Sequence, residues 1–226
     1  MTQFLRVAMR RALVRNGAIL FVAASAQSLS AQDTASGQRI GDNSWRLNAA
    51  VGSWVPRSAV IVGADGRDTR LGSGPSFSLD LSYAWTESVA LYGGGIVAFS
   101  RVTLGSAIQP TVVGPSDQTT VMGASGGLFL TSPRGWFGER LRPTLRLGAG
   151  LKGYAFDLEG TDGQWRPSGD FGLGFRGSSG GPIEVSAEVR YLPSSFDQGK
   201  LPIRGIVPQA QRQTDLILAI GITVRP

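Results

Sequence analysis

Two glycine-rich stretches have the spacing of a dinucleotide-binding fingerprint, GAGLKG at residues 148–153 and GLGFRG at residues 172–177. In that fingerprint a strand precedes the glycines and a helix starts at their end, so that backbone amides and the helix dipole meet a pyrophosphate. Here YAFDL follows the first stretch and SSGGP follows the second, and neither starts a helix. Small inward-facing residues or strand bends account for these glycines better, so we predict no nucleotide and no other cofactor.

Acidic residues form groups that could carry acid–base chemistry or hold Ca²⁺. Glu184 and Glu188 share one face of a predicted strand with Arg190, which favours structural ion pairing over catalysis. The other groups lie in polar segments without the spacing of a calcium loop, and Asp-Gly is above all a turn signal. These residues are Asp65, Asp68, Asp157, Glu159 and Asp162. We therefore predict neither catalytic residues nor a metal site.

The chain of 226 residues contains no His and no Cys. Imidazole and thiolate ligands for zinc, copper or haem are therefore missing, and so is every His-dependent catalytic triad. No disulfide framework stabilises the fold. These absences favour a protein that is not an enzyme.

The N-terminal residues have the pattern of a secretory signal. Four arginines and no acidic residue accompany the apolar stretch GAILFVAASA, residues 17–26. A membrane anchor needs about 20 apolar residues, roughly twice this run. We predict a signal peptide over residues 1–31, cleaved after Ala26 or Ala31, and a flexible lead-in over residues 32–44. The four arginines are Arg6, Arg10, Arg11 and Arg15.

Removal of the signal changes the charge of the protein. It takes 4 of the 22 basic residues away and leaves 18 against 16 acidic residues. The remaining basic residues form no stripe, so we predict no binding to nucleic acid.

Residues 45–226 are predicted to form one domain of short strands. Apolar and polar residues alternate in eight runs, and no helical period is sustained. In one of them Phe77, Leu79 and Leu81 alternate with Ser78 and Asp80. The runs cover residues 45–55, 76–85, 89–101, 119–131, 143–156, 165–176, 183–192 and 214–225.

Long connections alternate with short ones between these runs. An even number of antiparallel strands then brings the long loops to one end and both termini to the other, as in outer-membrane barrels. The predicted fold class is all-β, an eight-stranded antiparallel up-and-down transmembrane β-barrel. The mostly long, polar connections are residues 56–75, 102–118, 157–163 and 193–213; residues 86–88 and 177–181 are tight, and 132–142 are of medium length.

The polar face of the runs is rich in small residues and poor in Lys, which suits the crowded interior of a narrow barrel. Its charges are nearly balanced, as pairing inside a low-dielectric lumen requires. Periodicity alone leaves open a soluble barrel with its apolar face inward. The predicted polar network of the lumen consists of Arg46, Asp80, Arg146, Lys152, Asp170, Arg176, Glu184, Glu188 and Arg190.

Aromatic residues of the apolar face fall near its ends, where outer-membrane barrels carry girdles at headgroup depth. The core of a soluble sandwich is the competing interpretation. We predict Trp45, Trp85 and Phe175 near the inner boundary of the membrane, and Phe77, Phe99 and Tyr191 near the outer boundary.

The signal peptide, the alternating runs, the alternating loop lengths and the boundary aromatics resemble the small outer-membrane β-barrel family, which includes the OmpA transmembrane domain, OmpX and OmpW. The resemblance covers nearly the whole mature chain without a sharp motif. It implies the outer membrane of a Gram-negative bacterium, with lipid, lipopolysaccharide and the barrel-assembly machinery as partners. The chain departs from the family by ending TVRP, residues 223–226, without the terminal aromatic that the assembly machinery reads, so we expect less efficient assembly.

On this basis we expect a monomeric barrel with a structural, adhesive or surface-binding role carried by its outer loops. The outer-membrane barrel enzymes of the deacylase, phospholipase and protease types rely on a catalytic His, which this chain lacks. The alternatives are a small pore or conduit for small or hydrophobic solutes and, less favoured, a soluble periplasmic ligand-binding barrel. The loop arginines that could contact lipopolysaccharide are Arg57, Arg67, Arg70, Arg204 and Arg212.

Overall fold

The computed structural model describes residues 44–62, 68–103, 118–136, 140–156, 163–178, 182–197 and 210–225. The regular elements among them are all β-strands. No helix in this described part of the chain is long and apolar enough to cross a membrane. The predicted signal peptide and the predicted lead-in up to residue 43 lie outside the described residues.

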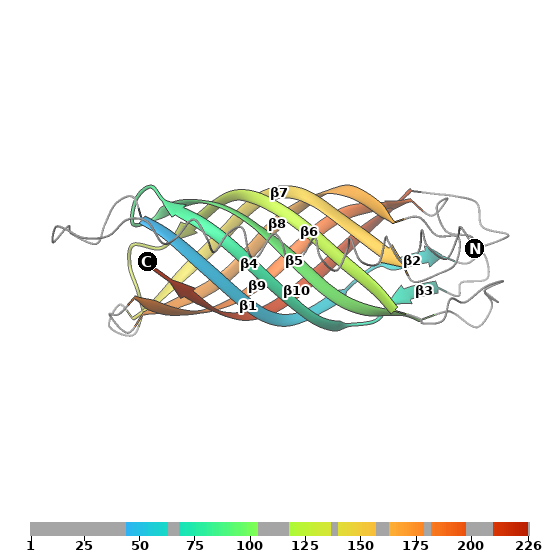
Figure 1. Ribbon diagram of the computed structural model, residues 1–226, viewed down its shortest axis with the longest axis horizontal. Helices are drawn as coiled ribbons and strands as arrows, with labels where there is room; N and C mark the ends of the chain where they lie inside the picture. Colours follow the sequence, from blue (N-terminus) through green and yellow to red (C-terminus); the bar gives the residue numbers. More distant parts are fainter. Residues whose placement is uncertain are drawn as a thin grey trace, which may run out of the picture. The chain divides into compact units, whose positions relative to one another are not determined.

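Eight of the strands form a closed antiparallel barrel, which confirms the predicted fold class (Figure 1). Each strand pairs with the next along the chain, and β10 pairs with β1, from Leu47 opposite Val224 to Pro56 opposite Asp215. Closure leaves no unpaired strand edge to face lipid. The strands are β1 (Ser44–Pro56), β4 (Gly74–Ala84), β5 (Val89–Thr103), β6 (Gln118–Thr131), β7 (Leu141–Phe156), β8 (Gln164–Ser178), β9 (Ile183–Asp197) and β10 (Ala210–Val224).

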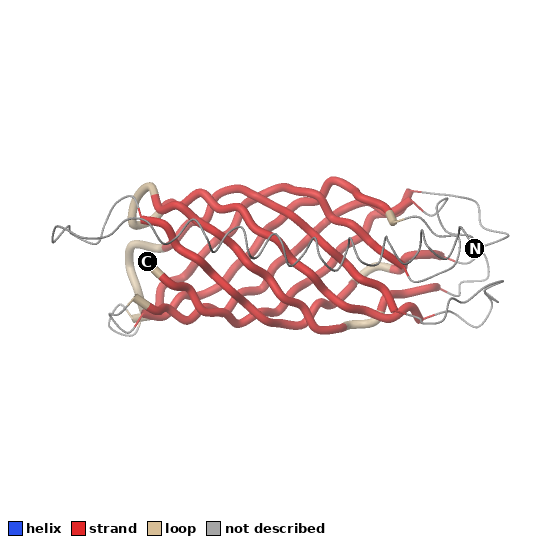
Figure 2. Tube along the Cα trace, viewed as in Figure 1, coloured by secondary structure: helices blue, strands red, loops and turns tan. Residues whose placement is uncertain are grey.

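One end of the barrel carries the start of β1, the end of β10 and the tight turn from β4 to β5, and we call it the turn end (Figure 2). The turn is closed by the backbone amides of Trp85 and Thr86, which donate to the carbonyl oxygen of Val89 at 2.9 and 3.1 Å. The Thr86 hydroxyl accepts the amides of Ser88 and Val89. The opposite end, where β1 ends and β4 begins, is the loop end.

The strands at the loop end extend further than the alternation predicted. β2 (Ala59–Val62) and β3 (Asp68–Leu71) form a hairpin that was not predicted. β3 also pairs with β5, with Leu71 opposite Val102. β9 and β10 pair as far as Asp197 opposite Ala210. Polar residues dominate this part of β9 and β10, so no apolar period marks it in the sequence.

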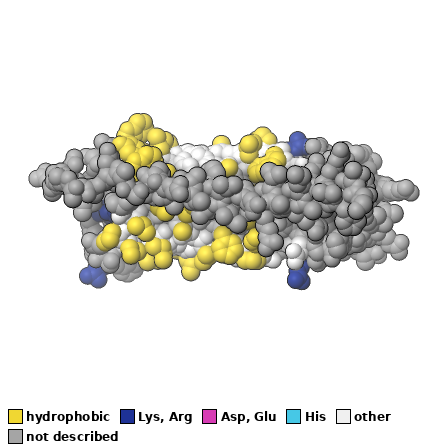
Figure 3. Space-filling view, viewed as in Figure 1, with side chains coloured by type: hydrophobic (Ala, Val, Ile, Leu, Met, Phe, Trp, Pro, Cys, Tyr) yellow, Lys and Arg dark blue, Asp and Glu magenta, His cyan; other side chains and the backbone are white. Residues whose placement is uncertain are grey.

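The barrel is apolar outside and polar inside. Val185 and Ile220 are 62% and 65% exposed, whereas Arg146 and Glu184 are 2% and 3% exposed. Figure 3 shows exposed hydrophobic side chains along the face in view, with Lys or Arg side chains toward both ends. This distribution is that of a membrane barrel and contradicts the soluble alternative, whose apolar face would point inward.

The lumen contains more apolar bulk than the sequence predicted. A cluster of buried side chains fills it toward the loop end, where Trp54 and Ile217 are almost completely buried. The expectation that small and ionic residues fill the interior is therefore wrong for this half. Side chains must fill the interior of an eight-stranded barrel, and bulky apolar ones do so without burying charge. The cluster consists of Trp54, Leu71, Ile96, Ala98, Val121, Tyr154, Leu192 and Ile217.

Candidate functional site in the barrel interior

Alternation along the strands directs the charged side chains to the inner face. Asp80 on β4, Arg146 on β7 and Asp170 on β8 all point into the lumen, because residues two apart in a strand share a face. All nine residues of the predicted polar network lie on this face, seven of them buried, with Arg46 and Glu188 half-buried. They separate into a central group, a loop-end group and a turn-end group.

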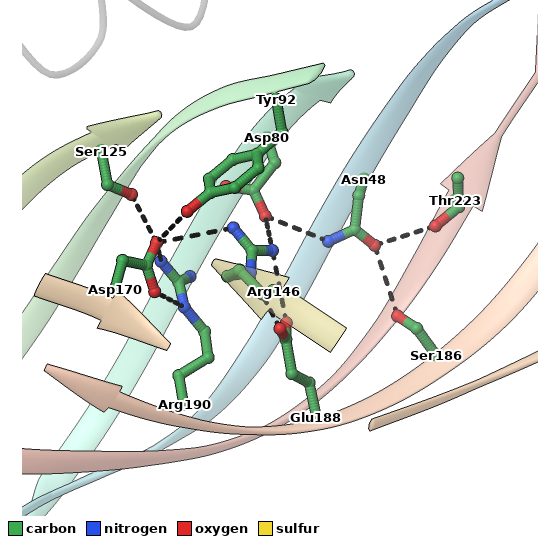
Figure 4. A network of polar contacts seen from close by, with 10 residues as sticks. All are labelled: Asn48, Asp80, Tyr92, Ser125, Arg146, Asp170, Ser186, Glu188, Arg190 and Thr223. Carbon is green, nitrogen blue, oxygen red and sulfur yellow. Dashed lines mark hydrogen bonds and ion pairs between the residues drawn. The ribbon is translucent and has the colours of Figure 1, made fainter. Parts of the chain in front are cut away.

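The central group surrounds Arg146 (Figure 4). Its Nη2 donates to Asp80 Oδ2 at 2.7 Å, and its Nε donates to Glu188 Oε1 at 2.8 Å. Its Nη1 lies 3.7 Å from Asp170 Oδ2. The guanidinium carbon is 4.4 Å from the centroid of the Tyr92 ring, a cation–π contact. One buried guanidinium therefore joins carboxylates from three strands.

Asp170 is the second centre of this group. Arg190 binds it with both a 2.7 Å bond from Nη2 and a 3.1 Å bond from Nε. The hydroxyls of Tyr92 and Ser125 donate to the same carboxylate at 2.9 and 2.6 Å. These bonds replace the water that the fully buried Asp170 has lost.

Asn48 on β1 extends the central group and was not predicted. Its amide nitrogen donates to Asp80 Oδ2 at 3.4 Å. Its carbonyl oxygen accepts the hydroxyls of Ser186 at 3.3 Å and Thr223 at 3.0 Å. Asn48 thus links strands on both sides of the β1–β10 closure.

The loop-end group pairs Lys152 with Asp215. The Lys152 Nζ lies 2.5 Å from Asp215 Oδ2 and donates to the Leu192 carbonyl at 3.0 Å. The Tyr154 hydroxyl donates to Asp215 at 3.3 Å. Asp215 was missed in the sequence, although its odd number puts it on the same face as Ile217.

The turn-end group contains Arg46, Arg176 and Glu184. Arg176 Nε lies 3.5 Å from Glu184 Oε2, and the Arg176 guanidinium carbon is 4.6 Å from the centroid of the Phe129 ring. Arg225, which is not among the predicted network residues, donates from Nη2 to the other Glu184 oxygen. Phe129 occupies the inner face as well, where the sequence offered no specific signal for an aromatic ring.

The six aromatic residues of the predicted girdles reach the surface. Trp45, Phe77, Trp85, Phe99 and Phe175 are exposed, and Tyr191 is half-buried. Two further aromatic rings join them at the turn end. Tyr83 lies 5.0 Å from Trp45 between ring centroids, and Trp136 lies 5.4 Å from Phe175.

The remaining sequence motifs are only partly covered by the described residues. The glycine-rich stretches lie inside strands, residues 148–153 in β7 and residues 172–177 in β8, and not at the strand-to-helix turn that a dinucleotide fingerprint needs. In the described part of the chain, no group of three or more Asp, Glu, His or Cys side chains is placed to hold a metal ion. Of the loop carboxylates, Asp68 begins β3, and the others lie outside the described residues: Asp65, Asp157, Glu159 and Asp162.

Comparison with known proteins identifies the fold. No protein-family model matches the chain, and no curated protein matches its sequence. Among solved structures, the chain is similar to the outer membrane protein OprG from Pseudomonas aeruginosa, with 13% identity, a TM-score of 0.56, and 82% of this chain and 97% of OprG covered. The chain is also similar to outer membrane protein AlkL, with 20% identity, a TM-score of 0.49, and 88% of this chain and 97% of AlkL covered. For Neisserial surface protein A the identity is 14% and the TM-score 0.49, with 80% of this chain and 97% of that protein covered.

The fold and the apolar exterior together define the class of protein. It is a small eight-stranded outer-membrane β-barrel, located in the outer membrane. The resemblance inferred from the alternating runs is thus confirmed at the level of the fold.

Proposed function

We propose that this protein is a non-conducting, non-enzymatic barrel that anchors its outer loops at the cell surface for a structural, adhesive or binding role. The filled interior carries the proposal. In the central group, one guanidinium joins carboxylates that project from three different strands across the lumen. Toward the loop end, a cavity beside Trp54, Val121 and Lys152 measures only about 10 Å³, roughly the space of one water molecule.

Planar-bilayer recording of the purified full chain tests this proposal against a small pore. A lumen filled by paired charges at its centre and by apolar side chains toward the loop end leaves no continuous water path, so we expect no steady conductance steps. The variants Arg146→Gln and Glu188→Gln should be equally silent. Steady steps in the unmodified protein whose size changes in either variant would show a conducting lumen and overturn the scaffold role.

Lipopolysaccharide is the surface partner that we propose for the loop end. Arg57 and Arg212 are exposed there. They follow the outward alternation of β1 and β10, and the Arg57 amide donates to the Thr214 carbonyl at 2.8 Å, so the two strands hold both arginines on neighbouring outer positions. Outward-facing guanidinium groups just beyond an apolar band suit the phosphates of the outer leaflet. The side chains of Arg67, Arg70 and Arg204 lie outside the described residues.

Binding of lipopolysaccharide to the protein in zwitterionic nanodiscs tests this partner. The double variant Arg57→Gln/Arg212→Gln should weaken binding about tenfold or more. Arg134→Gln removes an exposed arginine at the turn end and should leave binding unchanged. Equal affinity of the double variant and the unmodified protein would remove these arginines from the contact.

A further inference from the structure

Four arginines gather on the inner face at the turn end. β7, β8 and β1 contribute Arg142, Arg176 and Arg46, and Arg225 directly follows β10. β9, which lies between β8 and β10, contributes Glu184. Five neighbouring strands of the eight therefore carry the sequence of charges Arg, Arg, Glu, Arg, Arg around the lumen. We call Arg46, Arg142, Arg176 and Arg225 the turn-end arginine cluster.

The strand register forces like charges together in this cluster. Arg142 stands directly opposite Arg176 across β7 and β8. Arg46 and Arg225 each lie one position beyond the opposed pair Leu47 and Val224 of β1 and β10. Like charges in opposed positions of a sheet repel and destabilise it. The concentration of arginines is therefore a cost to folding, which Glu184 and the Phe129 ring compensate only in part.

The acidic groups nearby do not balance the cluster. Glu184 contacts Arg176 and Arg225. Glu188 attracts Arg176 at longer range, but it already accepts bonds from Arg146 at 2.8 and 3.3 Å. In the part of the chain that the structure describes, the Nε atoms of Arg46, Arg176 and Arg225 are buried and donate no hydrogen bond. Among the same described residues, one buried acceptor without a hydrogen bond, Glu184 Oε2, faces them and lies 3.5 Å from Arg176 Nε. Donors and positive charge thus exceed the acceptors around them.

The turn-end arginine cluster is accessible from the turn end of the barrel, and apolar side chains lie on the opposite side of the lumen. Arg46 and Arg142 are half-buried, and the Arg225 side chain is 25% exposed, so the group opens toward the turn end. Phe129 and Ala90 belong to an apolar cluster on the strands that complete the ring. Burial and the charges of Arg46 and Arg142 lower the pKa of Arg225, which lies beyond the last membrane strand. A low-dielectric wall strengthens the attraction of these guanidinium groups for an anion.

We propose that the turn-end arginine cluster binds a phosphate group at the mouth of the lumen, which faces the periplasm in barrels of this class. Guanidinium forks match phosphate oxygens in geometry, and the unused Nε–H donors supply bonds for them. Arg176 forms the buried floor of the site, and the half-buried Arg46 and Arg142 line its opening. The phosphate group can belong to a soluble compound or to a phospholipid headgroup.

Titration of the full chain in zwitterionic micelles with inorganic phosphate tests the site. A ligand that binds only the folded state raises the midpoint of unfolding as its concentration rises, and chloride at the same ionic strength should not. The double variant Arg46→Gln/Arg142→Gln should raise the dissociation constant about tenfold or more. The double variant Arg134→Gln/Arg140→Gln makes the same charge change at exposed positions of the same end and should bind as the unmodified protein does. Equal weakening in both variants, or no effect of phosphate on the unmodified protein, overturns the proposal.

The unmodified protein provides a second measurement that does not depend on the folding of variants. The arginine Nε–H signals in ¹⁵N NMR spectra should shift on addition of phosphate for Arg46, Arg176 and Arg225. Unchanged signals at saturating phosphate would contradict the site.

A competition experiment identifies the source of the phosphate group. Phosphatidylglycerol added to phosphatidylcholine nanodiscs should displace inorganic phosphate if the site takes a lipid headgroup. Undiminished binding of inorganic phosphate in these nanodiscs assigns the site to soluble phosphate compounds. The competition is carried out only after the titration has shown that inorganic phosphate binds. Either result then supports the site and identifies where its phosphate group comes from.

Discussion

At the scale of single residues, the barrel depends on charges that are buried and paired. Arg146 is the clearest case, because it holds Asp80 and Glu188 at hydrogen-bond distance inside the lumen. Removal of one member of such a group leaves its partners buried without compensation, which costs more than the pair itself contributes. The residues around Arg146 therefore act as a unit, and their effects on stability will not add.

Arg146→Gln should lower the free energy of unfolding by about 3–5 kcal/mol. The measurement is urea unfolding of the protein refolded into lipid vesicles. Arg142→Gln serves as the control, since this half-buried arginine lies on the same face of β7 but opposite Arg176, and its removal should be neutral or stabilising. Addition of Asp80→Asn to Arg146→Gln should recover part of the loss. An Arg146→Gln protein as stable as the Arg142→Gln protein would show that the central group is not the source of stability.

At the scale of the strands, glycine decides how closely side chains of the lumen approach their neighbours. A methyl group at Gly94 on β5 would overlap the Asp80 carboxylate and lie 2.6 Å from the carbonyl oxygen of Leu79. The adjacent Gly93 points to the opposite face, where nothing lies within 4 Å of the same added atom. Only Gly94 is therefore required for steric reasons, whereas the space beside Gly93 would admit a larger side chain.

Gly94→Ala should destabilise the barrel by about 1–3 kcal/mol, because Asp80 must leave its bond to Arg146 or β4 must move away from β5. Gly93→Ala should change stability by much less. Unfolding in urea and the yield of folded protein compare the two variants directly. Equal effects would mean that loss of glycine flexibility, and not crowding of the lumen, governs this strand.

At the scale of the whole molecule, the orientation of the two faces is the property on which membrane insertion depends. Ile220 lies near the middle of β10 and is 65% exposed. In water, a lysine at such a position would be harmless. At the centre of a bilayer it costs about 2–4 kcal/mol.

Ile220→Lys should therefore lower the free energy of unfolding in vesicles by about that amount. Glu87→Lys places the same side chain in the exposed turn between β4 and β5, outside the apolar band, and should cost less than about 1 kcal/mol. Equal stability of the two variants in lipid would be incompatible with a lipid-facing β10.

Much of the interior could be predicted because the alternation of a strand is a local property. Successive side chains point to opposite faces wherever the backbone is extended, so the parity of Arg146, Asp170 and Glu184 was enough to assign them to one face. The same rule covers Asp215 and Arg225. Both were left out because they lie at the ends of the last run, where apolar residues mark the alternation on one side only.

The sequence by itself determined which side chains share a face and where most strands lie, and the small, Lys-poor polar face favoured an apolar exterior. Only the tertiary structure decided which charges meet. Arg146 joins Asp80 across 66 positions of the chain, and Lys152 joins Asp215 across 63. These partners follow from strand register and from closure of β1 on β10, which depend on all eight strands at once. Local patterns carry no information about that geometry, and so the excess of arginines at the turn end became visible only when the ring was closed.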